Sequence, residues 1–120
     1  MFGPIKIKDL SPTEVSAMLG GGRIVLIDVR EPQEYAAGRI HGALNLPLST
    51  FDPKALPEPS DRTIVLQCGT GKRSAMAIER CQKEGLNVDC HLAGGIAAWR
   101  AAGLRTTVFD PATQGASGGK

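Results

Sequence analysis

The sequence is poor in aromatic residues and has no marked excess of charge of either sign. The aromatic side chains number five, scattered along 120 residues: Phe2, Tyr35, Phe51, Trp99 and Phe109. The 14 basic residues barely outnumber the 12 acidic ones and do not gather into a stripe. Binding nucleic acid takes a basic surface for the phosphates, and single strands also need aromatic side chains for stacking. We therefore predict that nucleic acid is not a partner.

Long apolar runs are missing as well. No apolar stretch in the sequence approaches the about 20 residues that a membrane-spanning helix needs. The N-terminus, where lysines alternate with Ile5 and Ile7 behind Pro4, lacks the apolar block of a signal peptide. The sequence therefore predicts no membrane association and a cytoplasmic location.

Cysteine and histidine are scarce. The three cysteines, Cys68, Cys81 and Cys90, lack the close C-x-x-C spacing of a zinc or dithiol site, and only two histidines accompany them. We therefore expect neither a structural metal nor a disulfide framework. Cys81 falls within a helical pattern and Cys90 within a candidate strand, so both are interpreted as core residues.

The remaining composition is that of a globular domain. Hydrophobic residues make up 42% and charged residues 22% of the chain, and 120 residues suffice for one core but not for two. We predict one domain over residues 1–105. The chain then becomes small and polar, above all over residues 110–120, which predicts a flexible C-terminal tail over residues 106–120.

Strand and helix patterns alternate along the chain. Ser11, followed by Pro12 and Glu14, is a helix start with a capping box. The sequence predicts strands at 5–7, 24–27, 43–46, 63–67 and 88–92, helices at 12–19, 31–37, 74–84 and 96–102, and a turn at 52–56. This alternation predicts an α/β fold, with a mostly parallel sheet of about five strands and helices on both faces.

The segment over residues 66–77 carries the chemistry. A buried strand delivers Cys68 into a loop that leads directly into a helix, and Asp28 also falls at a strand's carboxyl end, where parallel sheets bind ligands. Glycines free the loop to turn its N–H groups inward, and the helix N-terminus and two cations favour a thiolate. We predict that Cys68 is a nucleophile of low pKa within an anion cradle formed by Gly69, Thr70, Gly71, Lys72, Arg73 and Ser74.

Two other kinds of anion-binding loop share features with this segment. A P-loop requires glycine where Leu66 stands and serine or threonine where Arg73 stands, so that motif fails twice. A cysteine-dependent phosphatase also holds a thiolate in a nest of amides with an arginine at its far end. The length of the loop between the cysteine and the arginine decides whether this segment is of the phosphatase kind.

Several separated motifs together resemble the single-domain rhodaneses of the thiosulfate sulfurtransferase superfamily. They are Ile27-Asp28-Val29-Arg30-Glu31 with Glu34-Tyr35, the segment over residues 38–47, the loop over residues 68–74, and Ala93-Gly94-Gly95-Ile96 with Trp99. They follow the family's order and spacing across residues 5–104. The resemblance implies a three-layer fold with one catalytic domain over residues 1–105.

The resemblance also implies a reaction. Four residues separate Cys68 from Arg73, as in rhodaneses, whereas phosphatases of related fold have a longer loop that encloses phosphate. Cys68 would take a sulfane sulfur from thiosulfate or a persulfide donor and pass it to cyanide, a thiol or a protein acceptor. Lys72 and Arg73 would attract the donor's sulfonate, and no metal or organic cofactor is expected.

Supporting roles and alternatives complete the interpretation. Asp28 and Arg30 are expected to brace the loop by ion pairing or hydrogen bonding. Neither His41 nor His91 is assigned a catalytic role, because a thiolate already formed needs no general base. The alternatives are a binding module without catalysis, a carrier that serves one protein acceptor, a phosphatase, and an arsenate-reducing or redox enzyme that uses the further thiols.

Overall fold

The structure, a computed structural model, describes residues 3–58 and 60–108 and is built on one parallel sheet. Its strands are β1 (Lys8–Leu10), β2 (Ile24–Asp28), β3 (Leu44–Asn45), β4 (Thr63–Gln67) and β5 (Cys90–Leu92). They lie in the order β1-β5-β4-β2-β3, and every neighbouring pair is parallel. The predicted five-stranded parallel sheet is confirmed.

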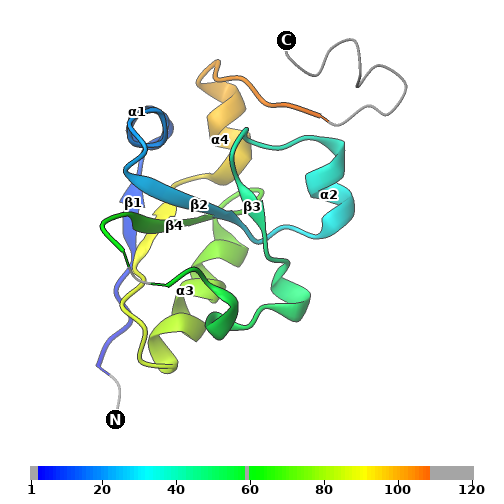
Figure 1. Ribbon diagram of the computed structural model, residues 1–120. Coiled ribbons are helices and arrows are strands. Elements are labelled where there is room, and N and C mark those ends of the chain that lie inside the picture. Colours follow the sequence, from blue (N-terminus) through cyan, green and yellow to red (C-terminus); the bar gives the residue numbers. More distant parts are fainter. Residues whose placement is uncertain (1–2, 59, 109–120) are drawn as a thin grey trace.

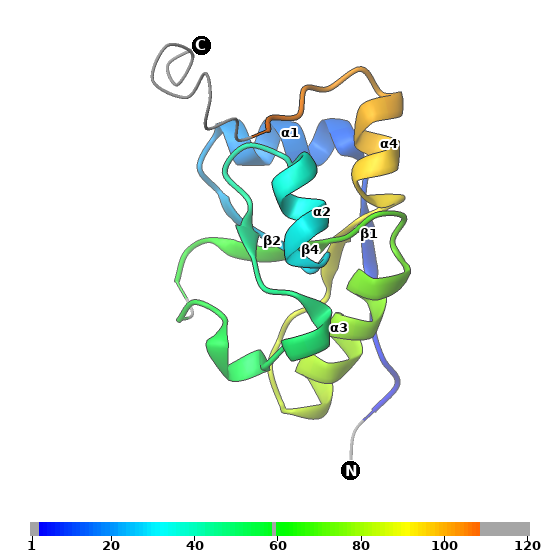
Figure 2. The same cartoon turned by 90° about the vertical axis from the view of Figure 1, so that its right-hand side faces the viewer.

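Helices cover both faces of the sheet. They are α1 (Pro12–Gly20), α2 (Pro32–Ala37), α3 (Lys72–Lys83) and α4 (Gly95–Ala101), with short 3-10 turns at Leu48–Thr50 and Pro53–Ala55. Figures 1 and 2 show α1 and α4 on one side of the sheet and α3 on the other. The three-layer α/β fold expected from the alternating patterns is therefore confirmed.

Each face of the sheet has its own apolar core. Val15, Ile96 and Trp99 pack from α1 and α4 on one side, together with Cys90 of β5. Ala77, Ile78 and Cys81 pack from α3 on the other. Cys81 is 0% and Cys90 7% exposed, so the core roles predicted for these two cysteines are confirmed, and Trp99, 5% exposed, also belongs to the core.

Local sequence signals account for several element boundaries. Ser11 caps α1 by accepting from the N–H of Glu14, whose carboxylate accepts in turn from the N–H of Ser11, as the capping box predicts. Strand β4 runs over the predicted residues, and β2 extends one residue past its predicted end, to Asp28. These boundaries are set by residues that are close in sequence.

The first strand was predicted wrongly. The alternating residues 5–7 lie outside β1, which begins at Lys8 because its partner strand β5 begins opposite it, at Cys90. The backbone of Lys6 instead bonds at both its N–H and its carbonyl to the side chain of Gln82 in α3. Ile5 is partly buried against the core but Ile7 is 45% exposed, so the two residues do not form one buried strand face.

The predicted tail boundary also needs correction. Thr107 exchanges two backbone hydrogen bonds with Arg39, so the hydrogen-bonded chain continues past residue 105. The rest of the predicted tail, over residues 109–120, lies outside the described residues. Among residues 3–58 and 60–108, none of the helices has the length and apolar character of a membrane span.

Candidate active site

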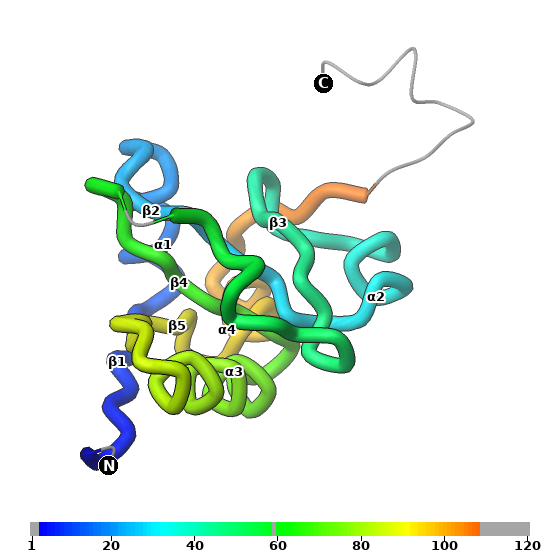
Figure 3. Tube along the Cα trace, turned by 60° about the horizontal axis from the view of Figure 1, so that its bottom comes forward, coloured from blue at the N-terminus to red at the C-terminus, as the bar shows by residue number. Residues whose placement is uncertain are grey.

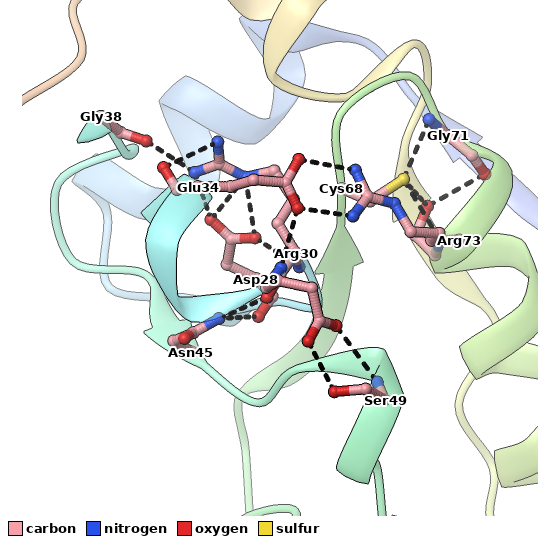
Figure 4. Close-up of polar contacts among 11 residues, drawn as sticks. Asp28, Arg30, Glu34, Gly38, Asn45, Ser49, Cys68, Gly71 and Arg73 are labelled. Carbon is pink, nitrogen blue, oxygen red and sulfur yellow. Dashed lines mark hydrogen bonds and ion pairs between the residues drawn. The ribbon is translucent and has the colours of Figure 1, made fainter. Parts of the chain in front are cut away.

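The loop that follows β4 wraps around the sulfur of Cys68 (Figure 4). Cys68 follows directly on the last residue of β4, and its side chain is almost fully buried, with 1% exposure. Gly71 turns the chain into α3 with φ of +108°, in the region that favours glycine. Helix α3 therefore begins at Lys72, ahead of the predicted start at Ser74, and its first turn points at the sulfur.

Hydrogen-bond donors converge on this sulfur. The N–H of Gly71 donates to Sγ at 3.1 Å and that of Ser74 at 3.3 Å, while the Ser74 hydroxyl oxygen lies 3.6 Å away. Burial raises the pKa of the Cys68 thiol, but hydrogen bonds from Ser74, Gly71 and Thr70 outweigh burial and bring the pKa below its ordinary value. The arrangement favours a thiolate.

The direction of this pKa shift and the part played by the loop's N–H groups match the prediction, but the two cations do not contribute as predicted. Lys72 is exposed at the start of α3, and Arg73 turns its guanidinium toward a carboxylate (Figure 4). The two nitrogens of Arg73 donate to the two oxygens of Glu34 at 2.7 and 3.0 Å. Donors of the loop itself, rather than nearby cations, therefore lower the pKa of Cys68 most.

The two loop glycines have different tasks. Gly71 has a positive φ, but Gly69 does not, so the expectation that both relax the backbone is wrong for Gly69. A side chain at Gly69 would begin 3.1 Å from an Arg73 nitrogen. Gly69 thus leaves space for the guanidinium on its way to Glu34.

Asp28 and Arg30 support the site at one remove. They form a buried ion pair of 2.8 Å with each other, rather than bonding to the loop of Cys68 as expected. Arg30 also donates to the carbonyls of Glu34 and Gly38, at 3.3 and 2.7 Å. The pair therefore fixes α2, and α2 presents Glu34 to Arg73.

Helix α4 holds the other side of the loop. The N–H of Ile96 donates to the carbonyl of Cys68 at 2.9 Å, and that of Ala97 to the carbonyl of Gly69 at 3.1 Å. This close approach is possible because Gly95 has no side chain: a Cβ there would lie 2.4 Å from the Cys68 carbonyl oxygen. The Gly94-Gly95 motif thus allows α4 to pack directly against the backbone of the loop.

Three further residues lie at the site, and the sequence predicts no role for them: Glu34, His91 and Asp9. His91 lies 2.8 Å from the Ser74 hydroxyl and 2.7 Å from Asp9. Each of these contacts joins residues far apart in sequence, so only the sheet order reveals them.

In the described ranges, no cluster of three His, Cys, Asp or Glu residues is placed to hold a metal ion.

The Glu34–Arg73 pair leads to a prediction about acid stability. The hydrogen bonds from Arg73 hold the pKa of Glu34 at about 2, against an ordinary value of 4.5. Because the folded pKa is the lower one, the stabilisation is complete above pH 4.5 and is lost as pH falls from 4.5 to about 2. Both side chains are about one-third exposed, so solvent screens the pair. We expect Glu34→Gln to lower the free energy of unfolding at neutral pH by about 0.5–1 kcal/mol.

Urea unfolding of the wild type and Glu34→Gln over a series of pH values tests this expectation. The difference between the two proteins should shrink toward zero below pH 4.5. Glu79→Gln, which breaks the more exposed pair with Lys83, is the matched control and should have a smaller effect at neutral pH. A difference for Glu34→Gln that stays constant with pH would contradict the assignment.

Comparisons with known proteins agree with this geometry. A family profile described as "Rhodanese-like domain" matches residues 11–102. The probable adenylyltransferase/sulfurtransferase MoeZ of Mycobacterium tuberculosis is 43% identical over 93 residues, 75% of this chain and 24% of MoeZ. A sulfurtransferase of Allochromatium vinosum is 37% identical over 81 residues, covering 68% of this chain and 76% of that protein.

The solved structures show the same likeness. The crystal structure of a rhodanese-related protein from Thermoplasma volcanium superposes with a TM-score of 0.72 and 28% identity, covering 85% of this chain and 99% of that one. Some curated relatives are much longer: this chain spans 24% of the length of MoeZ and 54% of another relative.

Proposed function

This chain belongs to the rhodanese-like domain family, and from that premise we propose that it is a sulfurtransferase in which Cys68 carries the sulfur. The family is one of sulfur transfer, and two of the relatives are named sulfurtransferases. The observation that carries the proposal is the buried Cys68 sulfur, which accepts hydrogen bonds from the N–H groups of Gly71 and Ser74. A loop closed this tightly suits a single sulfur atom better than a phosphate group.

The proposed reaction has two displacements. The Cys68 thiolate attacks the outer sulfur of thiosulfate; a new S–S bond forms, the donor's S–S bond breaks, and its electron pair leaves with sulfite. The anionic persulfide then lies among N–H donors already in place, which need no reorganisation when the charge arrives. An acceptor, cyanide or a thiol, attacks the outer sulfur and releases the thiolate.

The geometry bears on how the donor binds. Arg73 reaches Glu34 with both its terminal nitrogens, so its charge is largely neutralised within the site. Lys72, exposed on the first residue of α3, is the cation of the loop that remains open to an incoming sulfonate. The donor's sulfonate is thus attracted to the exposed side of the loop, at Lys72, rather than to Arg73.

Intact mass measurement tests the proposal directly. After incubation with thiosulfate, the wild type should gain about 32 Da, one sulfur atom, and lose it again on addition of cyanide. Peptide mapping should place the sulfur on Cys68, with Cys81 and Cys90 as internal controls, because burial raises the pKa of each of these two thiols to about 11. Cys68→Ala should gain nothing.

Failure of this experiment would separate the alternatives. If thiosulfate adds no sulfur but a persulfide donor does, the protein is a sulfur carrier with another donor. If neither loads Cys68 and a phosphate ester is hydrolysed, the phosphatase alternative replaces the proposal. If no reaction is found, the domain is a binding module.

A further inference from the structure

A continuous series of polar contacts leads from the buried sulfur to the protein surface. The Cys68 Sγ lies 3.6 Å from the Ser74 Oγ, which lies 2.8 Å from Nδ1 of His91. The Nε2 of His91 lies 2.7 Å from a carboxylate oxygen of Asp9. Cys68, Ser74 and His91 are 1%, 0% and 6% exposed, whereas the Asp9 side chain is 71% exposed. A thiol with only 1% exposure is thus connected to a carboxylate that is open to water.

The topology of the sheet brings these groups together. Strands β1 and β5 are far apart in sequence but lie side by side (Figure 3), with Asp9 in register with His91. Strand β5 in turn pairs with β4, which leads to Cys68, and Ser74 is on the first turn of α3. The contacts therefore run across the sheet and up to the helix, independently of the Glu34–Arg73 pair.

The hydrogens in this series can be assigned from chemistry. A carboxylate only accepts, so the Nε2 of His91 carries a hydrogen and donates it to Asp9. In neutral imidazole Nδ1 then accepts, and the Ser74 hydroxyl donates to it. The Gly71 carbonyl, 3.1 Å from the same hydroxyl, is a competing acceptor at longer distance. The Ser74 oxygen is left free to accept from the Cys68 thiol.

We propose that Asp9 and His91 are positioning residues that carry the proton of Cys68 to and from solvent through Ser74. The S–H bond of Cys68 breaks as its proton passes to the Ser74 oxygen, and the hydroxyl's own proton passes to Nδ1 of His91. The products are a thiolate that accepts from Ser74 and an imidazolium that donates to Ser74 and to Asp9. Protons are conserved, and no further reactant is needed.

The surroundings of His91 are compatible with this step. From β1 the titratable group that faces the imidazole is the Asp9 carboxylate, and from the loop after β4 it is Cys68, through Ser74. Helix α3, packed over this side of the sheet, buries Ser74, Ala77, Ile78 and Cys81. Burial raises the pKa of Cys81 to about 11, so that thiol stays neutral.

The test is the pH dependence of Cys68 alkylation by iodoacetamide, read by mass spectrometry for each cysteine. We expect His91→Asn to raise the midpoint by about one pH unit, which is roughly tenfold slower alkylation at about pH 6. Asp9→Asn, a surface substitution that does not threaten the fold, should slow it by about two- to threefold. His41→Asn, at the chain's other, exposed histidine, is the control and should match the wild type.

The route through Ser74 is tested by a double variant. In a Ser74→Ala background, His91→Asn should produce little further shift, because the imidazole has lost the hydroxyl through which it reaches the sulfur. Wild-type profiles for both Asp9→Asn and His91→Asn would overturn the proposal, and so would a full shift in the Ser74→Ala background. The proposal rests on the proposed function for its use in turnover, but alkylation requires no sulfur donor, so each can fail without the other.

Discussion

Replacing Cys68 with serine is expected to abolish sulfur transfer and leave the fold intact. A serine oxygen neither ionises near neutral pH nor forms a persulfide, so turnover should fall by at least about 10³-fold, to the uncatalysed background. The smaller hydroxyl can still accept from the N–H groups of Gly71 and Ser74, which now donate to the sulfur. The free energy of unfolding should therefore change by less than about 1 kcal/mol.

Cys81→Ser is the matched control for this variant. Cys81 is fully buried in α3 against the apolar core and takes no part in the loop. A hydroxyl there loses apolar packing and is poorly satisfied, so this variant should be destabilised by about 1–3 kcal/mol and keep its turnover. Steady-state assays and urea unfolding of the two variants should give opposite patterns. Turnover retained by Cys68→Ser would rule out the covalent mechanism.

Much of the fold could be predicted because its signals are local. The apolar run of β4 and the capping box at Ser11 are each contained within a few consecutive residues, and both predictions are confirmed. The alternation at Ile5 and Ile7 was an equally local signal, yet it was wrong. A strand needs a partner as well as a pattern, and β5 supplies a partner only from Lys8 onward.

The candidate site likewise has a part that could be predicted from neighbouring residues and a part that could not. Cys68 and the loop after it could be identified because strand, glycines and helix are consecutive in sequence. The ionic partner of Arg73 could not, because Glu34 is 39 residues away and is delivered by α2. Asp9 and His91 are 82 residues apart and meet only because β1 takes the edge beside β5. Composition and spacing carry no information about such sheet neighbours.

The packing of α4 against the loop leads to the second prediction. Gly95 has φ of +63°, and a Cβ there would lie 2.4 Å from the Cys68 carbonyl oxygen and 2.6 Å from the carbonyl carbon and oxygen of Gly69. These are backbone atoms, which no side-chain rotation can move away. The same carbonyls accept from the N–H groups of Ile96 and Ala97, so relieving the clash breaks the bonds that hold the loop.

Gly95→Ala is therefore expected to damage both stability and sulfur loading. A left-handed φ disfavours alanine by about 1–2 kcal/mol, and overpacking adds about 1–3 kcal/mol. Displacement of the loop would also move the Gly71 and Ser74 donors off the sulfur and raise the pKa of Cys68 toward its ordinary value. Urea unfolding and the rate at which thiosulfate adds sulfur to the protein, followed by mass, measure the two effects.

Gly20→Ala is the control for this variant. Gly20 lies at the end of α1, and a Cβ added there meets nothing within 4 Å, so the substitution should be neutral or stabilising. Wild-type stability and loading in Gly95→Ala would mean that α4 does not shape the loop.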